Sequence, residues 1–80
     1  MADKKKFAVF GLGRFGKSVA LTLTEMGHDV LGVDKDENIS ESLAEKLAQV
    51  VSFDIRDSRA LEQVGISNFD TVVIASANLE

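Results

Sequence analysis

The stretch FAVFGLGRFGKS, residues 7–18, decides the fold of this chain. A short apolar run, residues 7–10, leads into three glycines spaced G-x-G-x-x-G. Such a run is typical of a strand that is buried on both faces of a parallel sheet. In a phosphate-binding turn, Gly11 allows a sharp turn out of the strand, Gly13 lets a phosphate approach the backbone, and Gly16 lets the next helix pack tightly on the sheet.

An amphipathic helix is expected directly after this turn. Apolar residues recur at spacings of four, four and three, which predicts one helix face formed by Phe15, Val19, Leu23 and Met26. Gly27 is expected to end the helix in the left-handed conformation. The start of such a helix offers unpaired N–H groups and the positive end of its dipole to an anion. A strand before the glycines and a helix after them make the motif a specific signal.

The rest of the chain continues the alternation of strands and helices. We expect strands at residues 7–10, 29–34, 49–54 and 71–76. Because helical crossovers join the strands, the sheet is expected to be parallel, with right-handed crossovers and the order 3-2-1-4. The fold class is therefore α/β, a Rossmann-like doubly wound sheet. Residues 1–80 form one domain that stops just after the fourth strand, and we expect it to be an N-terminal fragment of a longer protein.

Two further helices connect these strands. Residues 37–48 place apolar side chains four residues apart, at Ile39, Leu43 and Leu47. A shorter helix is expected to be capped by Asp57 or Ser58 and closed by Gly65.

Asp34 is the acidic partner that a dinucleotide-binding motif requires. It ends the second predicted strand, 18 residues after Gly16 (34 − 16). A carboxylate at this point accepts hydrogen bonds from ribose hydroxyls and repels a 2′-phosphate, so NADP is disfavoured. The alternative is a loop acid or helix cap. Lys35 follows directly and is either part of the site or a solvated loop charge.

Three more polar residues are candidates for the same site. Arg14 follows the second glycine, and its guanidinium suits phosphate oxygens, although it is alternatively a solvent-exposed arginine. Asp54 and Ser76 end the third and fourth predicted strands. Ligands of open parallel sheets lie beyond the carboxyl ends of the strands, where Asp54 can accept from an adenine amino group. For both residues, a loop cap is the alternative.

The sequence contains no recognisable catalytic set. The single histidine, His28, is expected at the end of the sheet opposite the glycine turn, and there is no tyrosine or cysteine. The acidic residues show no metal-ligand spacing, so no metal site is expected. The net charge of −4 argues against nucleic acid as the main partner. No apolar run is long enough for a membrane-spanning helix.

Three longer stretches add a family resemblance: residues 7–37, GISNFDTVVIA at 65–75, and SANLE at 76–80. Together they resemble the start of the cytoplasmic regulatory subunits of bacterial Ktr- and Trk-type potassium-uptake systems. These subunits carry the RCK domain, also called KTN or TrkA-N. The resemblance covers essentially all 80 residues. One departure is SFDIRD at 52–57, where the family frequently has a Gly-Asp-Ala-like run.

The resemblance implies a nucleotide-binding regulatory role. It implies ATP or ADP as the ligand, with NAD(H) as a further candidate. It also implies a homo-oligomer, a dimer or ring in the full-length protein, that gates a membrane potassium channel or transporter subunit. Such a domain would be cytoplasmic and associated with the membrane only through that partner.

The resemblance also assigns a role to individual residues of the site. Arg14 would contact the distal phosphates, Asp54 and Ile55 would lie near the adenine, and Ala75 and Ser76 would lie near the ribose–phosphate edge. The complete set of predicted binding residues is Gly11, Gly13, Arg14, Phe15, Gly16, Asp34, Lys35, Asp54, Ile55, Ala75 and Ser76.

The sequence supports a non-catalytic nucleotide-binding regulator as the leading function. The alternative is the cofactor-binding half of an NAD-dependent oxidoreductase, whose catalytic residues would lie in another domain. A third class is a ligand-free interaction module, which would bind no adenine nucleotide.

Overall fold

The sheet has the predicted order. A computed structural model describes residues 4–75. The strands are β1 (Lys6–Phe10), β2 (Asp29–Val33), β3 (Gln49–Val51) and β4 (Thr71–Ile74), all parallel, in the order β3-β2-β1-β4. This confirms the Rossmann-like topology.

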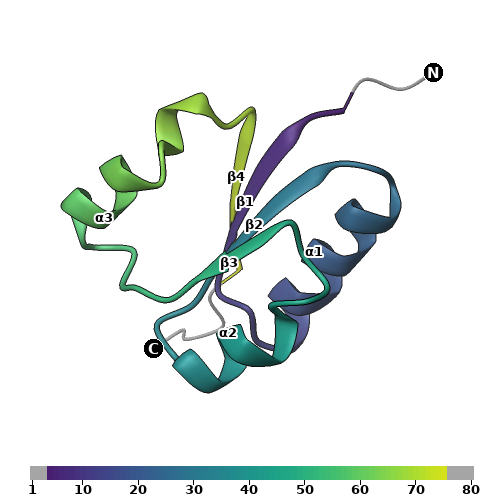
Figure 1. Ribbon diagram of the computed structural model, residues 1–80, viewed down its shortest axis with the longest axis horizontal. Helices are drawn as coiled ribbons and strands as arrows, with labels where there is room; N and C mark the ends of the chain where they lie inside the picture. Colours follow the sequence, from purple (N-terminus) through teal and green to yellow (C-terminus); the bar gives the residue numbers. More distant parts are fainter. Residues whose placement is uncertain (1–3, 76–80) are drawn as a thin grey trace.

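Helices cover both faces of the sheet. They are α1 (Arg14–Glu25), α2 (Glu37–Leu43), α3 (Ser58–Gln63) and the short 3₁₀ helix η1 (Ile66–Asn68). α1 and α2 lie on one side of the sheet and α3 on the other (Figure 1). Successive side chains of β1 alternate between these sides: Val9 packs in the cluster under α1 and α2, whereas Ala8 and Phe10 pack in the cluster under α3 and η1.

The buried face of α1 differs from the prediction. Phe15 is 69% exposed and Met26 is 61% exposed, so the prediction that these two side chains lie on the buried face of the helix is wrong. Gly16 and Ala20 are buried instead, and Leu23 packs against the core beside them. Gly16 must face the backbone of the preceding turn, which sets the rotation of the helix and directs the neighbouring Phe15 outward.

The second helix and the third strand are shorter than predicted. α2 ends at Leu43 rather than at residue 48, and β3 ends at Val51 rather than at residue 54. Leu47 is nevertheless 6% exposed, because the chain turns after α2 and carries this side chain into the core beside Gly32. Packing of one leucine thus outweighs the helical periodicity that predicted continuation.

The predicted caps are largely confirmed. Gly27 follows α1 with φ 95°, and Gly65 follows α3 with φ 72°, both in the left-handed region that favours glycine. Asp57, one of the two predicted candidates, caps α3 by accepting from the N–H groups of Arg59 and Ala60.

His28 lies in the turn before β2. Its Nδ1 accepts a hydrogen bond from the backbone N–H of Lys5 at 3.1 Å, and its ring meets Phe7 edge-on at 5.1 Å between centroids. These contacts agree with a structural histidine at the amino ends of the strands.

Candidate functional site

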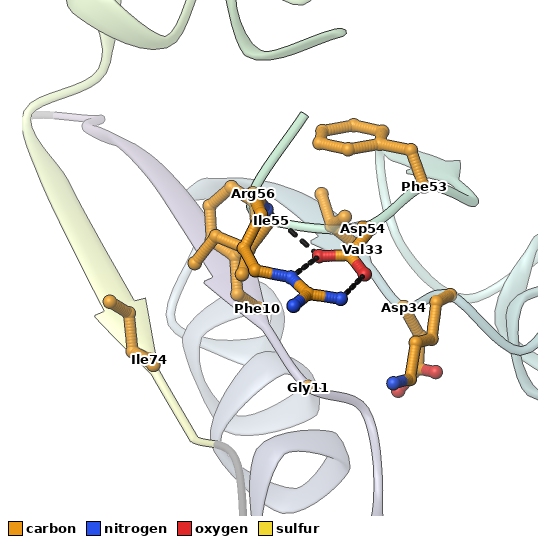
Figure 2. Close-up of a pocket in the computed structure, with 10 residues that line it drawn as sticks. Phe10, Gly11, Val33, Asp34, Phe53, Asp54, Ile55, Arg56 and Ile74 are labelled. Atoms are coloured by element: carbon orange, nitrogen blue, oxygen red, sulfur yellow. Dashed lines mark hydrogen bonds and ion pairs between the residues drawn. The ribbon is translucent and has the colours of Figure 1, made fainter. Parts of the chain in front are cut away.

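A cavity of about 370 Å³ lies at the carboxyl edge of the sheet. Its floor comes from one register row, in which Phe10 pairs with Val33 on one side and with Ile74 on the other. The turns after β1, β2 and β3 supply its rim (Figure 2). The lining residues are Phe10, Gly11, Val33, Asp34, Lys35, Phe53, Asp54, Ile55, Arg56 and Ile74.

The glycine turn is held in shape by its own backbone. Gly11 has φ 94°, and its N–H donates to the carbonyl oxygen of Val33 at 2.8 Å. A Cβ placed on Gly16 would overlap the carbonyl group of Gly11 and contact the Cβ of Ala75. The roles predicted for Gly11 in turning and for Gly16 in close packing are therefore visible in the geometry.

The middle glycine stands in open space. Gly13 precedes α1 with φ −69°, and a Cβ placed on it would meet no described atom within 4 Å. No side chain of the described residues caps α1, and its first turn contains no acidic residue. The first N–H groups of a helix have no partner within the helix, so this end of α1 suits an anion.

Asp34 connects the turn after β2 to the glycine turn. Its Oδ2 accepts from the backbone N–H of Leu12, and its Oδ1 accepts from the N–H of Asp36, both at 2.8 Å. An ionised carboxylate has about four acceptor sites, so each oxygen keeps further capacity toward the cavity.

Asp54 is paired with Arg56 inside the turn after β3. Arg56 donates its backbone N–H and its Nε to Oδ1, and its Nη2 to Oδ2, at 2.9, 3.1 and 2.9 Å (Figure 2). These bonds to the guanidinium and the N–H of Arg56 hold the pKa of Asp54 well below its usual range, and Lys35 adds a smaller effect. The same partnership raises the pKa of Arg56.

The cavity brings together about half of the predicted site residues. Gly11, Asp34, Lys35, Asp54 and Ile55 line it. The other predicted residues within the described part of the chain lie outside this lining: Gly13, Arg14, Phe15, Gly16 and Ala75.

The predicted residues that do not line the cavity lie in segments that border it. Arg14 and Phe15 are exposed in the first turn of α1. Ala75 donates its N–H to the carbonyl oxygen of Phe10, which places it beside the glycine turn. Ser76 lies outside the described residues.

Sequence reasoning missed Arg56 and the apolar floor of the cavity. A signal for Arg56 was present, because an aspartate that ends a strand is followed two residues later by an arginine. For Phe53 and Ile74 the apolar pattern indicated burial in a strand. The parallel register brings Ile74 into the floor of the cavity, and the turn after β3 brings Phe53 to its lining.

In chemical terms the cavity has an apolar floor, two carboxylates and an adjoining helix start. Such a set suits a molecule that combines a flat apolar ring, hydroxyl groups and an anionic group. Within residues 4–75, no group of three or more His, Asp or Glu side chains is placed to hold a metal ion.

The topology and the glycine turn define this chain as a Rossmann-like α/β domain with a cavity at the carboxyl edge of the sheet. The model of the TrkA-N domain family matches residues 7–80. The chain therefore belongs to the TrkA-N family, and the resemblance to potassium-uptake regulators is confirmed.

Similar potassium uptake proteins support this assignment. The chain is 42% identical over 72 residues to Ktr system potassium uptake protein C of Bacillus subtilis, and 40% identical over 77 residues to Ktr system potassium uptake protein A of the same organism. It is 34% identical over 71 residues to the Ktr protein A of Vibrio alginolyticus. The matches cover 90%, 95% and 89% of this chain, but only 33%, 35% and 32% of the relatives. The chain thus spans about a third of the length of the relatives it matches.

Solved structures share the fold at low identity. An ADP complex of N5-carboxyaminoimidazole synthetase from Staphylococcus aureus superposes with a TM-score of 0.75 at 22% identity, over 95% of this chain and 20% of that one. An ADP complex of the purK synthetase gives 0.75 at 21% identity, over 100% of this chain and 20% of that one. At such identity the likeness shows the fold alone.

Within the described residues, no helix has both the length and the apolar character needed to cross a membrane.

Proposed function

We propose that this chain is a non-catalytic regulatory domain that binds ATP or ADP and thereby controls a membrane potassium channel or transporter. The observation that carries the proposal is the junction of three features at one edge of the sheet. The uncapped start of α1, the carboxylate of Asp34 and the apolar cavity adjoin one another there. The start of α1 suits the phosphates, Asp34 suits the ribose and the apolar cavity suits the base, which is the order of these groups along a nucleotide.

The phosphates are assigned to the glycine turn. Gly13 leaves open space above the backbone, and the dipole of α1 favours a negative charge there. Ribose hydroxyls would donate to Asp34, whose two oxygens keep acceptor capacity. The base would lie on the apolar floor, with Ile55 and Asp54 at its edge.

The same carboxylate disfavours NADP. A 2′-phosphate on the ribose would meet the negative charge of Asp34 at hydrogen-bonding distance. NAD(H) carries a free 2′-hydroxyl and stays a candidate ligand beside ATP and ADP.

The ionisable lining of the cavity supports binding rather than catalysis. Among its described residues these side chains are Asp34, Lys35, Asp54 and Arg56. Asp34 accepts from two backbone N–H groups and Asp54 is paired with Arg56, so both carboxylates are held in fixed orientations as hydrogen-bond acceptors. A general base needs a pKa near the working pH, whereas the pKa of Asp54 is lowered.

The proposed partner follows from the relatives. Those named above are potassium uptake proteins, so the partner assigned to this chain is a membrane potassium-transport subunit. The proposed setting is the cytoplasmic side of the membrane, in a homo-oligomer formed by the full-length protein. A nucleotide would act by stabilising one arrangement of that assembly over another.

A binding titration tests the proposed function. The chain is titrated with ATP, ADP, NAD, NADH and NADP while amide chemical shifts are followed, and the Gly13→Ala variant is titrated in parallel. The added methyl group meets no described atom, so the variant should fold normally yet obstruct the phosphate. We expect ATP or ADP to shift the amides of Gly13 and Asp34 in the parent, with binding at least about tenfold weaker in the variant.

Other outcomes would change the assignment. Tight binding confined to NAD and NADH would favour the oxidoreductase alternative. Binding that is equal in the parent and in Gly13→Ala would contradict a phosphate site at this turn.

Arg14 is proposed to distinguish ATP from ADP. It begins α1 with an exposed side chain, and a γ-phosphate reaches further than a β-phosphate. Arg14→Ala should reduce the ratio of ATP to ADP affinity, measured by calorimetry, and Lys17→Ala on the next turn is the matched control. An unchanged ratio in Arg14→Ala would remove this role.

A further inference from the structure

Asp54 reaches the cavity with most of its hydrogen-bonding capacity already used. An ionised carboxylate offers about four acceptor sites, two on each oxygen. Oδ1 accepts from the N–H of Arg56 at 2.9 Å and from its Nε at 3.1 Å, and Oδ2 accepts from its Nη2 at 2.9 Å. Among the described contacts of Asp54, this leaves one acceptor site, on Oδ2.

The pairing of Arg56 with Asp54 is not explained by the packing of the fold. The side chain of Arg56 is 84% exposed and that of Asp54 is 35% exposed. Ion pairs at such exposure contribute little to stability. Both residues line the cavity, and Figure 2 shows two guanidinium nitrogens directed at the two carboxylate oxygens. The geometry is that of a planar fork, which fixes the orientation of the carboxylate.

The number of acceptor sites matters because purine bases present different donors. Adenine offers one amino group, N6, on its Watson–Crick edge, and one acceptor site is enough for it. Guanine offers N1–H and the N2 amino group side by side, and an unpaired carboxylate can take both, one on each oxygen. With Oδ1 filled by Arg56, only one of the two guanine donors can bond to Asp54, so guanine gives up the second charged hydrogen bond that an unpaired carboxylate would accept.

We propose that Arg56 is a positioning residue that makes this site select adenine over guanine nucleotides. It does so by occupying three acceptor sites of Asp54 and leaving a single one toward the base. This inference rests on the proposed function, because it requires the base of a nucleotide to lie against Asp54.

The test is a comparison of ATP and GTP affinities by calorimetry. The full 80-residue chain is measured beside Arg56→Gln and Arg56→Lys. Arg59→Gln is the matched control, since Arg59 is an exposed arginine of the neighbouring helix that does not line the cavity. All these side chains are exposed, so the variants should fold as the parent does.

We expect the parent to prefer ATP over GTP by about tenfold, the scale of one hydrogen bond to a charged group. In Arg56→Gln the preference should fall to about twofold or less, mainly because GTP binds more tightly. Arg56→Lys, which keeps the charge without the fork, should retain an intermediate preference. Arg59→Gln should match the parent.

Two results would overturn the inference while leaving the proposed function intact. One is an ATP preference that Arg56→Gln leaves unchanged or that Arg59→Gln lowers equally. The other is a parent that prefers GTP, which would mean that the guanidinium itself reads O6 and N7 of guanine. A parent that binds neither nucleotide would instead refute the proposed function, and this inference with it.

Discussion

The turns after β2 and β3 each hold one aspartate in place at the cavity, but they do so through different hydrogen-bond partners. Each brings one aspartate to the cavity, and each aspartate accepts from the N–H group two residues further on. The second partner differs. Asp34 also accepts from Leu12, which lies 22 positions away in the glycine turn, whereas Asp54 is held by the side chain of Arg56 in its own turn.

Asp34 is therefore held by a contact between two distant segments of the fold, whereas Asp54 is held by a contact within its own turn. The bond between Asp34 and Leu12 ties two segments together, so the glycine turn and the predicted ribose acceptor hold each other in position. The orientation of Asp54 depends on one exposed arginine, and a single substitution can alter it with little effect on the fold. We therefore expect substitutions near Asp34 to change stability and substitutions near Asp54 to change specificity.

The largest effect is expected for Gly16→Ala. The new methyl group would overlap the carbonyl group of Gly11, so the glycine turn and its bond to Asp34 would have to move. Overpacking of this kind costs about 3 kcal/mol or more in the free energy of unfolding. Urea denaturation should show it as a large loss, while Gly13→Ala should stay within about 0.5 kcal/mol of the parent. Equal midpoints for the two variants would contradict the assigned packing.

An intermediate effect is expected when the two aspartates are compared directly. Asp34→Ala leaves the N–H group of Leu12, a buried residue, without its described acceptor. The expected loss is about 1–3 kcal/mol of unfolding free energy. Asp54→Ala removes an exposed pair and should lower stability much less, as judged by the same denaturation experiment. A larger loss for Asp54→Ala would reverse the distinction between the two turns.

The smallest effect on stability concerns pH. Arg56 lowers the pKa of Asp54 below the ordinary value of 3.8, so the folded state binds this proton less readily than the unfolded state. The stabilising contribution is therefore complete above the ordinary pKa and is lost as the pH falls through the lower folded pKa.

Carboxyl ¹³C shifts can follow this titration residue by residue. At about pH 3 the Asp54 carboxylate should still be ionised in the parent, whereas in Arg56→Gln its pKa should rise toward the ordinary value. A parent whose Asp54 titrates at the ordinary value would show that the ion pair is absent in solution.

Much of this architecture was predictable from local patterns. The apolar run of β1, the glycine spacing and the acid at the end of β2 together predicted a parallel Rossmann-like sheet in the observed order. Gly27 and Gly65 were expected at helix ends, and both have positive φ. Such features depend on residues close in sequence, where steric and hydrogen-bonding preferences act directly.

The errors share one physical origin. Phe15 and Met26 were assigned to the buried face from spacing alone, but the rotation of α1 is set by the contact of Gly16 with Gly11. α2 was extended to residue 48 by periodicity, but the chain turns earlier and places Leu47 in the core. In both cases a contact with another segment outweighed the local pattern.

The sequence by itself determined the class of fold, the glycine turn after β1 and the two aspartates that follow β2 and β3. These follow from short-range rules, because glycine conformations and apolar runs act within a few residues. Only the tertiary structure decided that Phe10, Val33 and Ile74 form the floor of one cavity, since parallel register joins strands that are distant in the chain. It also decided that Asp34 holds the glycine turn while Asp54 is held by Arg56, because the direction of a side chain depends on what surrounds it.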